Sequence, residues 1–301
     1  MESRQTATLV SAAPTGAIPA IFPLRRQAWP WPTFNAPMIL ASLVLAVTLL
    51  SAALPGAIAP VLPTDMDMEA ILAPPSPLHW MGTDHFGRDI TSLLIYGARQ
   101  TLLMGGCSVI LGLSVGGLIG LLSGYAGGVA DMIIMRVIDI WMSVPYILMA
   151  IVIATALGAS FGHTILAIGV ITIPRYARVM RSRVLMVANQ PFIEASRSIG
   201  SSPLSIILHH LLPHTLAPML VMVTLGVAEG ILVGASLSFV GLGVIEDRPD
   251  WGFLLSQGRN YVTVAWWFAT FPGLALTLIV ISVNIVGDWL RKRLDPRLMA
   301  R

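Results

Sequence analysis

The chain has 301 residues, of which 55% are hydrophobic and only 11% are charged, and its mean hydropathy is +0.80. Because soluble domains carry about a quarter of their residues as charged side chains, this composition excludes a soluble protein and predicts a membrane protein. The net charge of +3 is too small for a nucleic-acid binder, and no basic stripe is interleaved with aromatic residues. The single cysteine, Cys107, excludes disulfides and cysteine-based metal sites within the chain.

Lysine is almost absent, because all but one of the 18 basic residues are arginine. A phosphate-binding P-loop needs a glycine-rich turn followed by Lys and then Ser or Thr, since the ammonium group must reach the terminal phosphates. The only lysine, Lys292, lies between two arginines with no such turn before it. We therefore expect no enzymatic activity in this chain, and if ATP drives the protein, a partner hydrolyses it.

The apolar runs predict an all-α membrane protein with six membrane-spanning helices, since a core of about 30 Å takes roughly 20 apolar helical residues. The expected crossings run over residues 36–62 and 101–125, from near Asp131 to a turn at 158–162, from that turn to near Arg183, and over residues 215–243 and 262–287. Pro55 should break or kink the outer end of the first crossing. The other five crossings form a core over residues 101–290.

Six crossings put both termini on one side of the membrane, and the arginines indicate which side. The segments on the side of the termini hold 14 of the 18 basic residues. Because positive charge accumulates in cytoplasmic segments, residues 1–35 and 291–301 are predicted to be cytoplasmic tails and residues 63–100 an extracytoplasmic segment. The first apolar run is far longer than a signal-peptide core, which favours a retained anchor.

The longest inner loop, about residues 184–214, carries signals for two short helices. Pro191 suits a first helical turn, and Glu194 complements the positive end of the helix dipole there. Gly200 can end the helix in a left-handed conformation, and Ser202 can cap a second helix that begins at Pro203.

The first of these helices is expected to have one apolar face. Phe192, Ala195 and Ile199 share a side at helical spacing, whereas Glu194 and Arg197 lie on the other side. From periodicity alone, two interpretations stay open: a docking surface for a partner protein, or an amphipathic helix that rests on lipid headgroups.

Several separated motifs resemble one family of transporters. Glu194, Ala195 and Ser196, followed by Gly200, His210 and Pro213, resemble the EAA motif of ABC importer permeases. Further segments are similar to the C-type permease of the dipeptide, oligopeptide and nickel importers: residues 82–84, 87–89, 237–239, 241–243, 271–273, Asn284, 287–288 and 294–297. The resemblance covers nearly the whole chain beyond the first tail.

The resemblance implies a type I ABC importer permease fold in the bacterial cytoplasmic (inner) membrane. It also implies four kinds of partner: a homologous B-type permease, two cytoplasmic ATP-binding subunits, an extracytoplasmic substrate-binding protein and the lipid membrane. ATP and Mg²⁺ would be bound by the ATPase subunits, so no cofactor is expected in this chain. The implied task is the passage of short peptides, with nickel or glutathione as the alternative cargo in the same family.

In this family the EAA loop is a coupling helix that sits in a cleft of an ATPase subunit. The resemblance assigns that role to Glu194, Ala195, Ser196, Arg197, Gly200, His210 and Pro213, with Arg197 as a salt-bridge contact. Two positions depart from the family pattern. Ser196 replaces the second alanine, and Gly234 stands where many relatives carry glutamate.

Glu229 is the only acid deep inside the fifth crossing, where an ionisable group costs roughly 2.5–3.5 kcal/mol. We expect it to face the bundle interior, either as a residue of the translocation path or as a structural hydrogen-bonding group between helices.

A second pattern lies in the second crossing, where Gly112, Gly116, Gly120 and Gly124 repeat every four residues. This smooth face favours close packing with another helix over contact with the substrate.

The segment after the first crossing is predicted to form a folded shelf with Asp–Arg pairing and glycine turns. This shelf is expected to receive the binding protein or to plug the pore. Its expected residues are Gly82, Thr83, Asp84, Gly87, Arg88 and Asp89, with residues 246–252 as a possible addition. No metal site is expected in this segment, because it has neither converging oxygens nor His pairs at helical spacing. His209, His210 and His214 are expected to cap helices and contact the partner.

Two other functional classes were weighed against the permease. A secondary transporter predicts paired interrupted helices in two inverted halves and several intramembrane ionisable residues, but only Asp139 and Glu229 qualify and no motif has a second copy. A membrane enzyme needs a nucleophile–base pair or metal ligands at the interface, and the histidines do not supply one. No catalytic residue is therefore assigned.

Overall fold

The computed structural model describes residues 35–243 and 249–294. Within these ranges the protein is helical, and β structure is limited to one isolated bridge between Thr83 and Asp89. The elements are α1 (Ala36–Ala53), α2 (Pro55–Ile58), α3 (Ile90–Ala126), α4 (Gly128–Met142), α5 (Tyr146–Leu157), α6 (Phe161–Ala188), α7 (Pro191–Ser198), α8 (Pro203–Ile206), the π-helix η1 (Ile207–Leu211), α9 (Leu212–Phe239), α10 (Trp251–Gly258), the 3₁₀-helix η2 (Arg259–Tyr261) and α11 (Trp266–Leu294). Three sets of residues named above lie outside the described ranges: the predicted tail up to residue 34, the end of the second tail from 295, and residues 246–248 of the loop 246–252.

Four helices in the described part are long and apolar enough to cross a membrane: α1, α3, the Pro218–Phe239 part of α9, and α11. The pair α4 and α5 passes the same test when taken together, which gives up to five spans. The prediction of an all-helical protein with membrane spans is confirmed for this part of the chain. The expected fourth crossing corresponds to α6, which carries four arginines and is not among these helices.

The expected third crossing is not one straight helix. It is divided into α4 and α5, which are bent by 86° relative to each other. The break lies at Ser143–Pro145, where Pro145 disfavours helical backbone at the residue before it and has no N–H to continue the ladder. The turn expected at 158–162 is present, because α5 ends at Leu157 and Gly158 has φ +85°.

The second helix starts eleven residues earlier than expected, at Ile90 rather than residue 101. Asp89 caps it, because the Asp89 carboxylate accepts a hydrogen bond from the Ser92 backbone N–H at 2.8 Å. Residues 90–100 therefore belong to α3, and the segment between α2 and α3 is shorter than predicted. Likewise α11 continues to Leu294, so the first residues of the expected C-terminal tail are helical.

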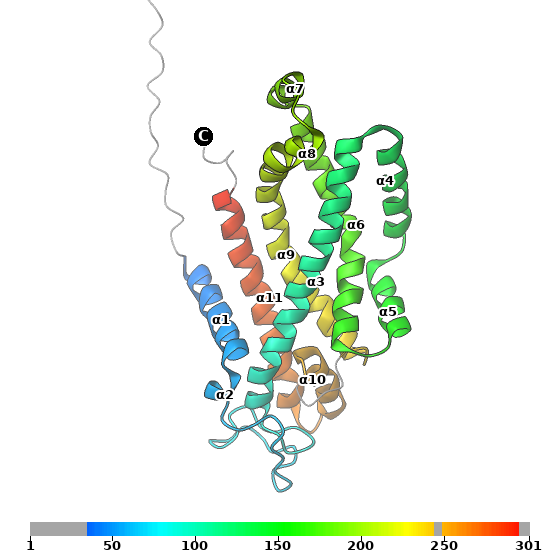
Figure 1. Ribbon diagram of the computed structural model, residues 1–301. Coiled ribbons are helices and arrows are strands. Elements are labelled where there is room, and N and C mark those ends of the chain that lie inside the picture. Colours follow the sequence, from blue (N-terminus) through cyan, green and yellow to red (C-terminus); the bar gives the residue numbers. More distant parts are fainter. Residues whose placement is uncertain (1–34, 244–248, 295–301) are drawn as a thin grey trace, which may run out of the picture. The chain divides into compact units, whose positions relative to one another are not determined.

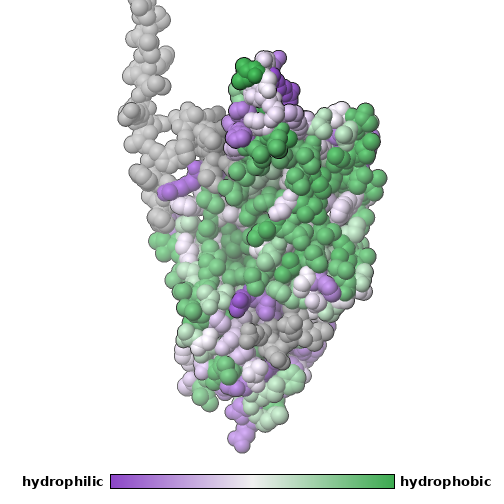
Figure 2. All heavy atoms as spheres, in the orientation of Figure 1, coloured by the Kyte–Doolittle hydropathy of each residue, from purple (hydrophilic) through white to green (hydrophobic). Residues whose placement is uncertain are grey.

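The long helices lie side by side, with α3 packed most extensively on α6 and also on α9 (Figure 1). The helices α7 and α8 lie at one end of this group, and the loops before α3 lie at the other end. Figure 2 shows apolar side chains over the helices between these ends and hydrophilic residues gathered at the ends themselves. Leu43, Ile110 and Ile140 are examples of exposed apolar residues, as expected for surfaces that face lipid or another membrane subunit.

The four-residue glycine repeat of α3 faces α6. A Cβ atom added at Gly116 or Gly120 would overlap backbone oxygens of α6, those of Ile173 and Ala177 respectively. At Gly112 the overlap would be with the Thr172 hydroxyl, and at Gly124 with the Val184 side chain. The prediction of close helix packing is confirmed, and the neighbour is a helix of the same chain.

This contact predicts that a single methyl group at Gly120 lowers stability. We expect Gly120→Ala to cost about 1–3 kcal/mol, because it overpacks a helix contact against backbone that cannot move aside. The thermal midpoint of the purified protein in detergent measures the effect. Gly117→Ala is the matched control on the same helix, since its Cβ would make only ordinary contacts, with the Met180 side chain at 3.5 Å and the Leu113 side chain at 4.0 Å. Equal midpoints for the two variants would contradict the packing argument.

Candidate functional site

The short helix α7 forms where the sequence predicts it. Pro191 occupies its first turn, and Gly200 after it has φ +84°. The Ser202 hydroxyl accepts a hydrogen bond from the Ser205 backbone N–H at 3.3 Å and so caps α8, which starts at Pro203. Local capping signals therefore define this pair of helices, here called the α7–α8 unit (residues 191–206).

The α7–α8 unit presents the predicted apolar face to its surroundings. Phe192, Ala195 and Ile199 are exposed, Ile199 to 83%. The residues that α7 buries are Ile193 and Ser196. Ile193 packs into a cluster with Val184 of α6, Ile206 of α8, Leu211 of η1 and other buried residues. One side of α7 therefore fixes the unit to the helices, and the opposite side is open.

Polar and aromatic contacts attach α7 to the start of α9. The Ser196 hydroxyl donates a hydrogen bond to the Ser201 hydroxyl at 2.9 Å and lies 3.3 Å from His210 Nε2. The Phe192 ring stacks on His214 with centroids 5.3 Å apart. Alanine at position 196 would make no such hydrogen bonds, so the departure from the EAA pattern adds a contact.

The two charged residues of α7 differ in their environment. The Arg197 guanidinium lies 5.9 Å from the centre of the Tyr125 ring at the end of α3. Glu194 is exposed, and no described residue forms a hydrogen bond or ion pair with its carboxylate.

Pro213 lies in the first turn of α9 and is also exposed. The remaining histidine of this region, His209, contacts the Ser205 carbonyl oxygen, and no group of three or more metal-ligating side chains converges anywhere in the described ranges.

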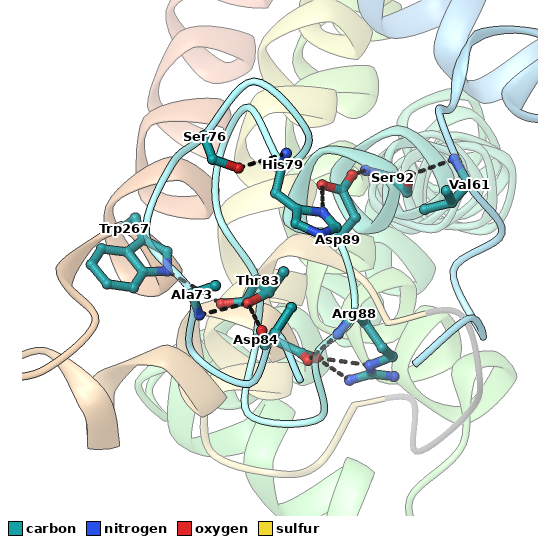
Figure 3. Close-up of polar contacts among 11 residues, drawn as sticks. Val61, Ala73, Ser76, His79, Thr83, Asp84, Arg88, Asp89, Ser92 and Trp267 are labelled. Carbon is teal, nitrogen blue, oxygen red and sulfur yellow. Dashed lines mark hydrogen bonds and ion pairs between the residues drawn. The ribbon is translucent and has the colours of Figure 1, made fainter. Parts of the chain in front are cut away.

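The shelf (residues 63–89) is organised around the buried carboxylate of Asp84 (Figure 3). One oxygen accepts hydrogen bonds from the backbone N–H groups of Phe86 and Arg88 at 2.8 and 2.9 Å. The other oxygen accepts from the Arg88 side chain, with both contacts at 2.7 Å. The expected Asp–Arg pairing is present, and both partners are almost inaccessible to solvent.

Thr83 and two glycines hold the turns of the shelf. The Thr83 hydroxyl donates to the Ala70 carbonyl oxygen and accepts from the Ala73 backbone N–H at 2.8 Å. Gly82 and Gly87 have φ +76° and +75°, and a Cβ on Gly87 would overlap the backbone of Asp67. Glycine is required here because it adopts a positive φ readily and has no Cβ atom that would overlap the neighbouring backbone.

The shelf is attached to the ends of two long helices. Asp89 caps α3 and also contacts His79 Nδ1 at 3.2 Å. At the start of α11, Trp267 Nε1 donates to the Thr83 carbonyl oxygen at 3.2 Å. His85 stacks on the rings of Tyr261 and Phe268, and burial lowers the pKa of this histidine, so its imidazole is neutral at pH 7.

The structure changes the interpretation of the shelf motif. Of its six expected residues, five are buried and Arg88 is nearly so. These residues stabilise the shelf and are not accessible for contact with another protein. The large exposed side chains nearby are apolar, namely Leu78, Trp80 and Met68, which are 77%, 70% and 74% exposed.

Three arginines of α6 form ion pairs that sequence reasoning missed. Arg181 pairs with Asp131 and Arg178 with Asp139, both on α4. Arg175 pairs with Glu229 on α9. The sequence carried a signal for these pairs, because the three arginines are three residues apart and so lie on one side of a helix. Glu229 does face the interior of the bundle, and its partner is an arginine from the neighbouring helix.

The Arg175–Glu229 pair lines a cavity of about 290 Å³. The cavity lies between α6 and α9 at the break between α4 and α5. Most of its lining is apolar or aromatic: Trp141, Met142, Val144, Pro145, Tyr146, Met149, Ile168, Ile171, Pro174 and Val233. A cavity of this kind, apolar with a few polar groups, is typical of small-molecule sites.

Comparison with known families finds a match over residues 116–300 to the model described as "Binding-protein-dependent transport system inner membrane component". The chain is 40% identical over 235 residues to the probable D,D-dipeptide transport system permease protein of Escherichia coli K12, covering 78% of this chain and 79% of that protein. It is 42% identical over 224 residues to the dipeptide transport system permease protein of Alkalihalophilus pseudofirmus, covering 74% of each.

A solved structure shares the fold. The inward-facing MetNI methionine ABC transporter matches with a TM-score of 0.55 and 21% sequence identity, covering 67% of this chain and 96% of the matched one. The helix arrangement described above is therefore similar to that of the matched chain of this transporter.

The buried ion pair of the shelf leads to a stability prediction. Asp84→Ala leaves the nearly buried Arg88 guanidinium without its partner, which should lower local stability by about 3–5 kcal/mol. Faster amide hydrogen exchange in peptides covering residues 83–92 would measure this loss. Asp65→Ala is the control, because the exposed Asp65 accepts only one hydrogen bond, from the Leu62 N–H. Unchanged exchange in the Asp84 variant would contradict the assignment of Asp84 as the centre of the shelf.

Proposed function

The chain belongs to the family of binding-protein-dependent transport system inner membrane components, and on this basis we propose that it is a permease subunit of an ATP-driven importer of short peptides. The peptide cargo is supported by the two relatives described above, both of which are named for dipeptide transport. The single structural observation that carries the proposal is the α7–α8 unit, which is fixed on one side and apolar and open on the other.

The proposed assembly contains this chain, a homologous B-type permease and two cytoplasmic ATP-binding subunits. An extracytoplasmic binding protein delivers the peptide, and no nucleic acid takes part. In the bacterial inner membrane, α6 would be the fourth of six crossings and the broken pair α4 and α5 the third, with both termini in the cytoplasm. The positions of α7 and the shelf at opposite ends of the helices support this orientation (Figure 1).

The proposed coupling uses the short connection between α6 and α7. Only two residues separate Ala188 from Pro191, and Ile193 packs into the same cluster as Val184 of α6. Closure of the ATPase subunits would push on Phe192, Ala195 and Ile199, with Glu194 and Arg197 as polar contacts beside them. Because α7 cannot move without α6 and α9, this push would rearrange the membrane-spanning helices. ATP hydrolysis would then reset them, and no covalent chemistry occurs in this chain.

Transport by the complete complex in proteoliposomes tests the proposed cargo. With its binding protein and internal ATP, the complex should accumulate labelled dipeptides and tripeptides. Nickel ions and glutathione are tested in the same assay. ATP-dependent uptake of either one, with none of the peptides, would replace the proposed cargo with that substrate.

Two substitutions in α7 separate coupling from folding. We expect Ile199→Asp to leave assembly intact and to reduce peptide uptake at least tenfold, because it places a charge on the proposed docking face. Glu194→Arg should act in the same way, with Glu194→Gln as the milder comparison. Uptake and the ATPase activity stimulated by the loaded binding protein are the measurements.

Ile193→Asp is the contrasting variant on the buried side of the same helix. It should lower the amount of folded protein, since it buries a charge within an apolar cluster. Wild-type uptake by both Ile199→Asp and Glu194→Arg would disprove the coupling assignment.

A further inference from the structure

The cavity beside the α4–α5 break holds one positive and one negative side chain in a wall that is mostly apolar, with Thr172 as a further polar residue. We propose that it is a recognition site for the two charged ends of a short peptide, in which Arg175 binds the terminal carboxylate and Glu229 binds the terminal ammonium group. This inference rests on the proposed function and specifies which groups of the peptide this chain recognises.

The Arg175–Glu229 pair differs from a sealed structural ion pair. Its side chains are 45% and 34% exposed, whereas the structural pair of the shelf, Arg88–Asp84, is only 11% and 0% exposed. Ionisable groups within membrane-spanning helices are costly, and those that are retained usually face a pathway or a water-filled cavity. The open geometry leaves both charged groups accessible from the cavity that they line.

The shape of the cavity fits a small polar molecule. Its volume of about 290 Å³ is near the lower end of small-molecule sites, which span about 300–1,000 Å³. Part of its lining is the non-helical backbone at Val144 and Pro145. Irregular backbone at membrane depth is tolerated where it is buried in protein or lines a water-filled cavity. The Trp141 side chain also lines the cavity, and its Nε1 is buried without a hydrogen-bond partner among the described residues.

The charges of the pair match a zwitterion better than any single ion. A guanidinium group binds a carboxylate in a planar, two-pronged geometry, and a carboxylate accepts hydrogen bonds from an ammonium group. A bound zwitterionic peptide would replace the Arg175–Glu229 ion pair with two ion pairs, one at each end of the peptide. It would add no net charge to the membrane interior. A divalent cation would instead be repelled by Arg175. Met149, Ile168, Ile171 and Val233 provide apolar walls, which tolerate varied side chains on the peptide.

Binding measurements on the complete transporter test this inference. The complex is placed in lipid nanodiscs without nucleotide and without binding protein, so that only peptide binding to the transporter itself is measured. The probes are labelled trialanine, N-acetyl-trialanine and trialanine amide. We expect the wild type to bind free trialanine at least tenfold more tightly than either blocked form. Each factor of ten corresponds to about 1.4 kcal/mol.

The variants assign each end of the peptide to one side chain. Arg175→Gln should abolish the preference for the free carboxylate over the amide and keep the preference for the free amino group. Glu229→Gln should do the reverse, and Arg175→Lys should retain a preference for the carboxylate. Asp139→Asn is the matched control. It breaks another ion pair of α6, Arg178–Asp139, whose residues do not line the cavity, and should keep both preferences.

A wild type that binds the blocked and free peptides equally, or variants that keep both preferences, would overturn the inference. Peptide uptake by the same preparation with its binding protein would show that the proposed function stands in that case. Absence of all peptide uptake would instead disprove the proposed function, so the two failures are distinguishable.

Discussion

The contact between α3 and α6 is the constraint on which the other functional features depend. The two helices approach so closely that a Cβ atom has no space at Gly112, Gly116 or Gly120. This contact fixes one side of α6, and the other side then presents its arginines to α4 and α9. Because α6 leads directly into α7, the same contact also determines where the open apolar face of α7 lies. Packing of backbone against backbone thus connects the ion pairs of α6 with the position of α7.

Local signals in the sequence were sufficient for the α7–α8 unit. Pro191, Gly200 and Ser202 act through the conformation of their own backbone or that of near neighbours, so their effects could be predicted without the fold. The burial of Ile193 and Ser196 could not be predicted in this way, because their contacts come from Val184, Leu211 and His210. The early start of α3 was a missed local signal, since Asp89 was assigned to the shelf and not considered as a helix cap.

Long-range pairing explains the remaining differences. Glu229 was correctly expected to face the interior, but its partner Arg175 lies 54 residues away, and periodicity carries no information about such a distance. The division of the third crossing at Pro145 had a local cause, but the bend of 86° is set by how α4 and α5 pack separately on α6. The internal pairing of the shelf motif was predicted, but the burial of its residues was not, because sequence shows which side chains can bond and not which of them become buried.

The attachment of the shelf has a mechanical consequence. Asp89 joins the shelf to α3, the Trp267 indole joins it to α11, and the Trp251 indole of α10 donates to the Leu94 carbonyl oxygen of α3 at 2.8 Å. The helix α3 is thus tied at one end to α10 and α11, which lie far from it in sequence, by groups that are almost fully buried. Of the three, α3 also packs along α6, which leads into α7, so a tilt of α3 would turn about the end that is tied to the shelf. Displacement along α3 would then be smallest at the shelf and largest at its other end, where Tyr125 lies beside Arg197 of α7.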